Sequence, residues 1–201
     1  MFLIGIAGPS GSGKTELARA LAQSLDAPVL SLDSYYPDMA HLPLEERART
    51  NFDVPEMIDH ELLSAHLRTL TGGGAVEVPV YDFTCNSRTD RTETVSAGEF
   101  GVLEGLWALH WEDIRRLLGI KVYVDTPDEV CFERRLARDL RERGRSAESV
   151  EAQYAAMTRP MAQRYVLPLR DFADVVVSGI EPIESSVAAL RAEALARAGR
   201  P

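Results

Sequence analysis

The sequence contains only two cysteines, Cys85 and Cys131, and they lie far apart in the chain. Two distant cysteines give neither a disulfide framework nor the paired spacing of a metal site, so we expect both thiols to be reduced. Long hydrophobic runs are also missing, because the longest one near the N-terminus spans only residues 2–7 and no basic segment precedes it. Such a run suits neither a transmembrane helix nor a signal peptide, which favours a soluble, cytoplasmic protein without a membrane partner.

Positive charge is scarce in this chain. Its 22 lysines and arginines are outnumbered by 31 aspartates and glutamates, which gives a formal net charge of -9. A field of this sign repels polyanions, so we expect no nucleic-acid partner and only local binding of phosphate groups. The sequence also lacks internal repeats and low-complexity linkers, and its 201 residues suit a single domain over residues 1–201.

Short apolar, β-branched runs alternate with helical patterns along the chain, which is typical of an α/β fold with a parallel central sheet flanked by helices. The predicted central strands are residues 2–7, 29–32, 100–104, 121–125 and 174–178. The predicted helices are residues 14–24, 59–70, 127–143, 147–164 and 183–198. Pro160 and Pro168 are expected to kink or end the fourth helix. Short alternating segments broken by Pro79 and Asn86 predict a β-hairpin insertion over residues 75–97.

The strongest motif is a glycine-rich loop between the first strand and the first helix. Residues 8–15 read Gly-Pro-Ser-Gly-Ser-Gly-Lys-Thr and match G-x-x-x-x-G-K-[ST], the pattern of a phosphate-binding loop, or P-loop. Gly8 and Gly13 let backbone amides turn toward phosphate oxygens. Lys14 reaches the β and γ phosphates, and Thr15 supplies a hydroxyl for magnesium. The loop therefore predicts a P-loop NTPase fold that binds ATP, or alternatively GTP, and Mg²⁺. The other loop residues predicted to bind nucleotide are Ser10, Gly11 and Ser12.

A second acidic centre is expected beside the P-loop, to hold the metal directly or through water. Glu104 ends a short apolar strand and is followed by glycine, so it is the first candidate. Asp125 also follows a strand, but Asp-Thr-Pro before a helix is ordinary capping chemistry. We therefore predict a metal site of Thr15, Glu104 and Asp33, and interpret Asp125 as a structural cap.

The features that accompany the P-loop indicate the class of protein. No Asn-Lys-x-Asp element is present, which disfavours a guanine-nucleotide switch, and the chain is short for a motor or a transport ATPase. A kinase of a small acceptor needs an acidic residue to receive the acceptor's proton and arginines to neutralise the migrating phosphoryl group. The sequence offers both, which favours a phosphotransferase.

The arginines form a predicted helical lid over about residues 127–146. Six of them fall within twelve residues: Arg134, Arg135, Arg138, Arg141, Arg143 and Arg145. Four of these share one helical face that suits a triphosphate: 134, 138, 141 and 145. The alternative is a solvated helix whose arginines pair with Glu133, Asp139 and Glu142. With the P-loop present, the spacing favours the lid.

Asp33 is the candidate for the acceptor side. It follows the second predicted strand, and the carboxyl ends of parallel strands share one edge of a sheet with the P-loop. A carboxylate there reaches a hydroxyl near the γ phosphate, whereas the alternative role is an Asx turn. We predict Asp33 as the base, with Lys14 and Arg138 as the other catalytic residues.

Together these residues resemble the uridine kinase (uridine-cytidine kinase) family, which is related to the phosphoribulokinases. The similarity runs from about residue 4 to residue 177 and rests on several segments in the same order. Those segments are residues 8–15, 33–36, 51–53, 79–83, 104–105, 134–145, 153–154 and 173–174.

The resemblance implies a homo-oligomeric kinase that uses Mg²⁺ and ATP to phosphorylate the 5′-hydroxyl of uridine or cytidine. It implies that Asp33 activates this hydroxyl, and that Tyr81 and Phe83 contact the pyrimidine, although packing inside the hairpin is their alternative role. The residues implied to hold the ribose hydroxyls are Asp53, Arg135 and Gln153. Those implied to bind phosphates are Arg138, Arg143 and Arg145.

The chain departs from the family pattern near both expected ligands. Asn86 stands where many members have a histidine that contacts the base, and Val54 replaces a histidine beside the ribose site. Residues 178–181 replace a glycine-rich turn near the expected adenine position. These departures leave two alternatives open, namely a same-fold kinase for a sugar phosphate or vitamin precursor, and a nucleotide-binding regulator without transferase activity.

Overall fold

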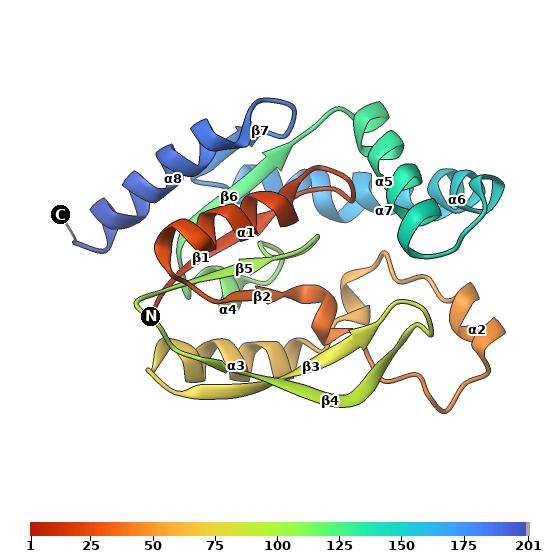
Figure 1. Cartoon of the computed structure of the whole chain (residues 1–201), viewed down its shortest axis with the longest axis horizontal. Coiled ribbons are helices and arrows are strands. Elements are labelled where there is room, and N and C mark those ends of the chain that lie inside the picture. The colour runs from red at the N-terminus through yellow and green to blue at the C-terminus, as the bar shows by residue number, and fades with distance from the viewer. Residues whose placement is uncertain (200–201) are drawn as a thin grey trace.

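The computed structural model describes residues 1–199, apart from the side chains of Ala48 and Arg49, so the last two residues of the predicted domain lie outside the described part. Five parallel strands form a central sheet in the order β2-β5-β1-β6-β7 (Figure 1). Their bounds are β1 (Phe2–Ala7), β2 (Val29–Ser31), β5 (Phe100–Glu104), β6 (Leu118–Asp125) and β7 (Val175–Ser178). The predicted α/β fold with a parallel central sheet is confirmed, and the P-loop follows the central strand.

The two faces of the sheet belong to two separate apolar cores. Because side chains alternate along a strand, Leu3 of β1 faces one core while Ile4 and Ile6 face the other. Helix α3 (His60–Thr71) and the short helix α4 (Glu112–Arg115) contribute to the first core. Helices α1 (Lys14–Leu25) and α8 (Ile183–Arg197) contribute to the second. Strand β1 is therefore covered on both faces, which explains its continuous apolar run.

Three strand bounds differ from the sequence prediction. Strand β7 begins at Val175 rather than at residue 174, and the other two differences have a local reason. Strand β6 begins at Leu118 rather than at residue 121, because Leu118 already pairs with Leu3. Strand β2 ends at Ser31, since Leu32 begins the 3-10 helix η1 (Leu32–Tyr35). The Ser31 hydroxyl accepts a hydrogen bond from the Asp33 N–H and caps this helix. The cap fixes Asp33 just beyond the sheet.

The predicted hairpin is formed by β3 (Ala75–Asp82) and β4 (Ser87–Ser96), which pair antiparallel outside the central sheet (Figure 1). Its turn includes Asn86, whose φ of 49° lies in the left-handed region that asparagine tolerates. Helix α2 (Leu44–Arg49) and the 3-10 helix η2 (Pro55–Met57) lie in the connection before α3.

The arginine-rich helix predicted to be a lid is α5 (Asp128–Glu142), which follows β6, and we keep the name lid for it. The predicted helix over residues 147–164 is a helical run that changes its hydrogen-bonding type: α6 (Ala147–Gln153), η3 (Tyr154–Thr158), α7 (Arg159–Met161), η4 (Ala162–Val166) and η5 (Leu167–Phe172). Two π-helical segments, η3 and η4, lie on either side of α7, which contains Pro160, and Pro168 lies in the final 3-10 segment. Pro160 lacks an N–H donor, so the ladder of hydrogen bonds is altered there without ending the run.

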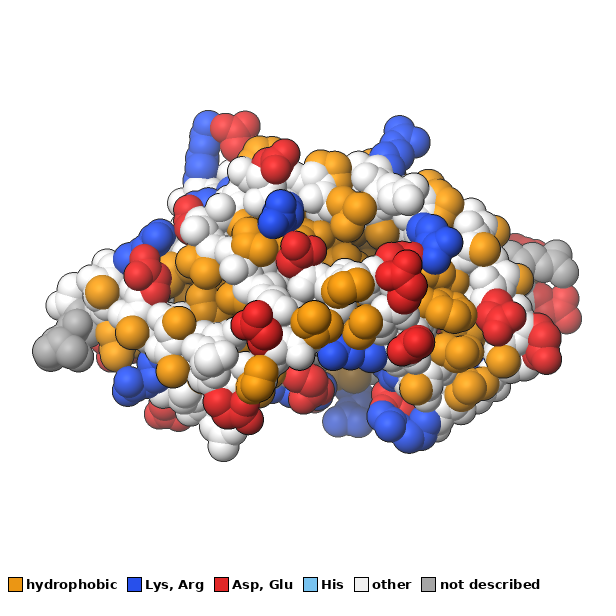
Figure 2. Space-filling view, turned by 90° about the horizontal axis from the view of Figure 1, so that it is seen from above, with side chains coloured by type: hydrophobic (Ala, Val, Ile, Leu, Met, Phe, Trp, Pro, Cys, Tyr) orange, Lys and Arg blue, Asp and Glu red, His pale blue; other side chains and the backbone are white. Residues whose placement is uncertain are grey.

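The molecular surface carries mixed charge. On the face seen in Figure 2, acidic and basic side chains are interspersed with apolar ones, and this face shows no continuous basic surface. Within residues 1–199, no helix combines the length and the apolar character needed to cross a bilayer.

Candidate active site

The P-loop holds a conformation that requires glycine. Gly11 and Gly13 have φ angles of 84° and 94°, and a Cβ atom on Gly11 would lie 2.2 Å from the carbonyl oxygen of Cys131. Helix α1 begins directly after Gly13. The Lys14 ammonium donates a hydrogen bond of 3.4 Å back to the Pro9 carbonyl. The loop thus presents backbone amides of a helix N-terminus, beside a lysine, to any anion above it.

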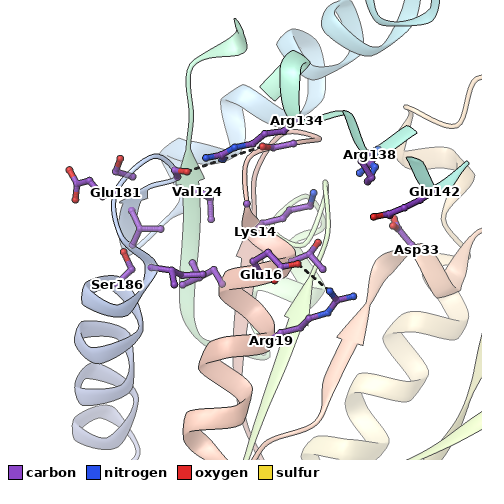
Figure 3. A pocket seen from close by; sticks show the side chains of 18 of the residues that line it. Lys14, Glu16, Arg19, Asp33, Val124, Arg134, Arg138, Glu142, Glu181 and Ser186 are labelled. Atoms are coloured by element: carbon purple, nitrogen blue, oxygen red, sulfur yellow. Dashed lines mark hydrogen bonds and ion pairs between the residues drawn. The ribbon is translucent and has the colours of Figure 1, made fainter. Parts of the chain in front are cut away.

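A cavity of about 580 Å³ lies over the P-loop, and we call it the P-loop cavity (Figure 3). Lys14 lies between Arg134 and Asp33, with Glu181 and Ser186 at the end away from Asp33. The P-loop residues that line it are Gly11, Gly13, Lys14 and Thr15. The predicted nucleotide contacts Gly8, Ser10 and Ser12 do not line it. Residues 178, 179 and 181, predicted to lie near adenine, do line it.

The arginines of the lid do not all face this cavity. Arg134, Arg138 and Arg141 line it, whereas Arg145 lies beyond the end of α5 and lines a second cavity. The predicted single face of four arginines is therefore wrong for Arg145, because the chain leaves helical geometry after Glu142. Arg134 donates hydrogen bonds to backbone carbonyls, at 2.9 Å to Gly179 and 3.4 Å to Gly11 and Ser12. It ties the lid to the P-loop.

The second cavity, about 90 Å³, lies between the hairpin and the lid, and we call it the hairpin cavity. All seven residues predicted for the acceptor line it: Asp33, Asp53, Tyr81, Phe83, Asn86, Arg135 and Gln153. Five residues line both cavities: Lys14, Thr15, Asp33, Arg138 and Arg143. The structure thus brings together the residues predicted to bind the acceptor, and Asp33 connects them to the P-loop cavity.

Aromatic rings form one wall of the hairpin cavity. Tyr81 lies 5.3 Å from Tyr36 and 5.1 Å from Phe83 between ring centroids, and the Arg143 guanidinium lies 4.2 Å over the Phe83 ring. Tyr81 and Phe83 also pack against the apolar core, which is the alternative role considered for them, and their contact with a pyrimidine stays a prediction. Burial raises the pKa of Tyr81, which keeps its hydroxyl protonated and able to donate.

The polar part of the hairpin cavity is built from hydrogen bonds between segments that lie far apart in the sequence. Thr158, in the π-helical segment η3, donates a hydrogen bond of 2.8 Å to the Asp53 carboxylate. The Gln153 side-chain oxygen accepts hydrogen bonds from Arg135 at 3.1 Å and from Arg145 at 2.7 Å. These bonds fix a carboxylate, an amide and guanidinium groups around one space, which is the donor and acceptor set that suits a cis-diol.

The two carboxylates predicted for the metal lie close to the P-loop threonine. Glu104 is 3% exposed and accepts hydrogen bonds from Thr15 at 3.1 Å and from Ser31 at 2.7 Å. It lines neither main cavity but an adjoining hollow of about 290 Å³, together with Thr15, Ser31 and Asp33. Burial raises the pKa of Asp33, the negative charge of Glu104 raises it further, and nearby cationic side chains including Lys14 oppose the shift.

This donor set fits magnesium. Two carboxylates whose charges repel each other, beside a hydroxyl, form a hard-oxygen site that a divalent cation would stabilise. Among the residues that the structure describes, no group of three or more His, Cys, Asp or Glu is placed to hold a metal by itself. Asp125 is not part of this group, since it lies 3.5 Å from Arg170, and helix α5 has no side-chain cap. Its predicted capping role is therefore wrong.

Two residues of the site escape the sequence interpretation. Thr158 gives no local signal, because its partner Asp53 lies 105 positions away. The sequence analysis considers Asp139 only as a member of solvated ion pairs. In the structure this residue is 0% exposed and lies among the lid arginines. Its i, i+4 spacing from both Arg135 and Arg143 is the pattern that signals this cluster.

Comparison with known proteins identifies the family. Residues 3–184 match the Phosphoribulokinase / Uridine kinase family. The chain belongs to this family. The resemblance found in the sequence is thereby confirmed. As a member of this family, the chain is a P-loop kinase that transfers a phosphoryl group to an alcohol.

Relatives of similar length are close in sequence. This kinase is 44% identical to the uridine kinase of Chloroflexus aggregans over 197 residues, which cover 96% of this chain and 94% of that protein. It is 42% identical to the uridine kinase of Shewanella amazonensis over 182 residues, covering 87% and 86% of the two chains.

Solved structures share the fold at lower identity. A putative fructose transport system kinase from Silicibacter sp. TM1040 superimposes with a TM-score of 0.72 at 22% identity, covering 88% of this chain and 89% of that one. Phosphoribulokinase from Rhodobacter spheroides gives a TM-score of 0.61 at 16% identity, with 88% and 69% covered. At these identities the likeness shows the architecture alone.

Proposed function

We propose that this kinase transfers the γ-phosphoryl group of ATP to the 5′-hydroxyl of a pyrimidine nucleoside, uridine or cytidine, and releases the nucleoside 5′-monophosphate and ADP. The observation that carries the proposal is the meeting of the P-loop cavity and the hairpin cavity at Asp33. The uridine kinase relatives at 42% and 44% identity support the same substrate class.

The nucleotide occupies the P-loop cavity in this proposal. Its phosphates contact the loop amides and Lys14, and its base extends toward residues 178–181. Thr15 and Glu104, with Asp33 beside them, hold magnesium, which when bound offsets the charge of the β and γ phosphates. Arg138 and Arg143 line both cavities and therefore face the group in transfer.

The nucleoside occupies the hairpin cavity. Asp53, Arg135 and Gln153 bind the ribose hydroxyls, and Asp53 is oriented for this by the hydrogen bond from Thr158. The pyrimidine lies against Tyr81 and Phe83, with the Asn86 amide at its edge. This pose directs the 5′-hydroxyl toward Asp33, which is one of the five residues that line both cavities.

Asp33 receives the proton of the 5′-hydroxyl as the oxygen attacks the γ phosphorus and the bond to the ADP oxygen breaks. Burial raises the pKa of Asp33, as does the charge of Glu104, which makes it a stronger base than an exposed aspartate. In a loose phosphoryl-transfer transition state, such a base mostly orients the nucleophile. Loss of Asp33 should therefore reduce the rate far more than it reduces nucleotide binding.

The test is ADP release from the full chain with Mg²⁺ and ATP, or GTP in a parallel series, in the presence of single acceptors. The panel contains uridine, cytidine, adenosine, a sugar phosphate and pantoate as a vitamin precursor. We expect stimulation by uridine or cytidine well above the level without acceptor. The proposal would be contradicted if only the sugar phosphate or the vitamin precursor stimulated ADP release. It would also be contradicted if the protein bound nucleotide but showed no turnover with any acceptor.

A further inference from the structure

A single buried carboxylate lies at the centre of the lid arginines. Asp139, on α5, is 0% exposed. Its Oδ1 atom accepts hydrogen bonds from Arg138 at 2.8 and 2.9 Å and lies 3.6 Å from Nε of Arg143. Its Oδ2 atom lies 3.3 Å from Arg145 and 3.8 Å from Arg135. Four guanidinium groups thus share one carboxylate.

The two oxygens of Asp139 serve different parts of the site. The partners of Oδ1, Arg138 and Arg143, line both the P-loop cavity and the hairpin cavity. The partners of Oδ2, Arg135 and Arg145, line the hairpin cavity and also hold Gln153. Every lid arginine that reaches the hairpin cavity is therefore in contact with Asp139.

The backbone of Asp139 holds the same segment. The N–H groups of Arg143 and Arg145 donate hydrogen bonds of 3.2 and 3.3 Å to the Asp139 carbonyl oxygen. Between them, Gly144 has a φ of 60°, which lets the chain turn after α5. The turn and the side-chain contacts place the guanidinium groups of both arginines around the carboxylate.

Electrostatics make this arrangement depend on the charge of Asp139. Like charges in a partly buried cluster repel strongly, and a carboxylate in contact with each of them offsets this repulsion. Burial and the neighbouring Arg138 charge lower the pKa of Arg143 to about 10, while Asp139 acts in the opposite direction. Without the carboxylate, the arginines would be driven apart and toward solvent.

We propose that Asp139 is a positioning residue that fixes the arginines of the nucleotide side and of the acceptor side at the same time. It touches neither substrate and acts through the guanidinium groups. The identity of the acceptor rests on the proposed function, but the effect on ATP binding does not.

The test is Asp139→Asn in the full chain, which keeps the shape and removes the charge. We expect the KM values for ATP and for uridine to rise together by about tenfold each and kcat to fall by about tenfold, as for a buried charged pair that loses one partner. The ratio kcat/KM for each substrate should then fall by about 100-fold. Glu133→Gln is the matched control, because Glu133 is an exposed carboxylate on the same helix and lines neither cavity. Its kinetics should equal those of the wild type.

The readout separates positioning from a structural role. A residue that only stabilises the fold would lower the melting temperature and leave both KM values of the folded enzyme unchanged, and that result would overturn the proposal. A shift in only one KM would overturn it as well. If Asp139→Asn does not fold, Asp139→Glu keeps the charge but displaces the oxygens by about 1 Å, and both KM values should still rise. Wild-type KM values in the Glu variant would then contradict the proposal.

Failure of this inference is distinguishable from failure of the proposed function. If the wild type releases no ADP with any pyrimidine nucleoside, the proposed function fails. Calorimetric titration with ATP alone still tests Asp139 in that case. The dissociation constant of Asp139→Asn should exceed that of the wild type by about tenfold, and equal values would overturn the inference.

Discussion

The P-loop cavity and the hairpin cavity meet at Asp33, but they are built in different ways. The floor of the P-loop cavity is one continuous loop whose shape depends on glycine backbone angles and on the close approach of Gly11 to the Cys131 carbonyl. The hairpin cavity takes its wall from segments far apart in sequence, joined by side-chain bonds such as the one from Thr158 to Asp53. Backbone conformation fixes the first cavity and side-chain hydrogen bonds fix the second.

This difference predicts how each cavity responds to substitution. A loop fixed by its backbone tolerates few residues, so the nucleotide side should be sensitive to any added Cβ. A wall fixed by side chains can change one contact at a time, as at Asn86, and thereby change the acceptor without altering the fold. Substitutions on the two sides should therefore affect different kinetic constants.

Asp33→Asn tests the point where the two cavities meet, and it has the largest expected effect. The amide cannot take the acceptor's proton, so kcat should fall by about 10²–10⁴-fold. ATP affinity should remain, because the P-loop backbone is untouched. Steady-state kinetics and titration with ATP measure the two quantities. Full turnover in Asp33→Asn would show that this residue is not the base. It would also contradict the proposal that transfer takes place where the two cavities meet at Asp33.

Gly11→Ala tests the backbone-defined side. The new Cβ would lie 2.2 Å from the Cys131 carbonyl oxygen, so the loop must shift, with a loss of stability of about 1–3 kcal/mol and weaker ATP binding. Gly73→Ala is the matched control, because its φ of 90° resembles the 84° of Gly11 but nothing lies within 4 Å of its Cβ. Thermal unfolding and ATP titration should show a clearly larger loss for Gly11→Ala. Equal losses would mean that the contact with Cys131 is unimportant.

Thr158→Val tests the side defined by hydrogen bonds. It keeps the side-chain shape but removes the donor to Asp53, so the KM for uridine should rise by about tenfold, as for one lost bond to a carboxylate. The KM for ATP should stay unchanged. Thr158→Ser keeps the hydroxyl and should retain most of the uridine affinity. If both KM values rise in Thr158→Val, the two sides are not independent.

The pH profile gives the smallest expected effect. Asp33 must be ionised to accept a proton, and its pKa is raised above the ordinary 3.8 by burial and by Glu104. Activity should therefore be lost as the pH falls through this raised pKa, so the acidic limb of kcat/KM should lie above pH 3.8. Circular dichroism at each pH confirms that the protein is still folded. An acidic limb at or below the ordinary value would show that Asp33 is not in the environment described.

Local patterns predict the sheet and the P-loop well. Strands β1 and β5 have the predicted bounds because buried strands are continuous apolar runs, and residues 8–15 are a contiguous motif. The acceptor residues are grouped by family resemblance, since Asp53 and Gln153 come together only through tertiary packing. Thr158 is missed for the same reason.

The lid shows where local patterns give an incomplete picture. Helical spacing identifies the arginine-rich segment but places Arg145 on the wrong side, because the helix ends at Glu142. The sequence interpretation also counts Asp139 among solvated ion pairs, although its i, i+4 spacing from Arg135 and Arg143 is the signal of the cluster. Its complete burial results from packing against segments that the pattern of α5 does not describe.

The most direct test of the proposed activity is the position of the transferred phosphoryl group. Uridine and 5′-deoxyuridine are incubated separately with the kinase, Mg²⁺ and ATP, and the products are analysed by phosphorus NMR. We predict uridine 5′-monophosphate from uridine and no transfer to 5′-deoxyuridine, which lacks the hydroxyl directed at Asp33. Phosphorylation of 5′-deoxyuridine, or of another hydroxyl of uridine, would contradict the proposed activity.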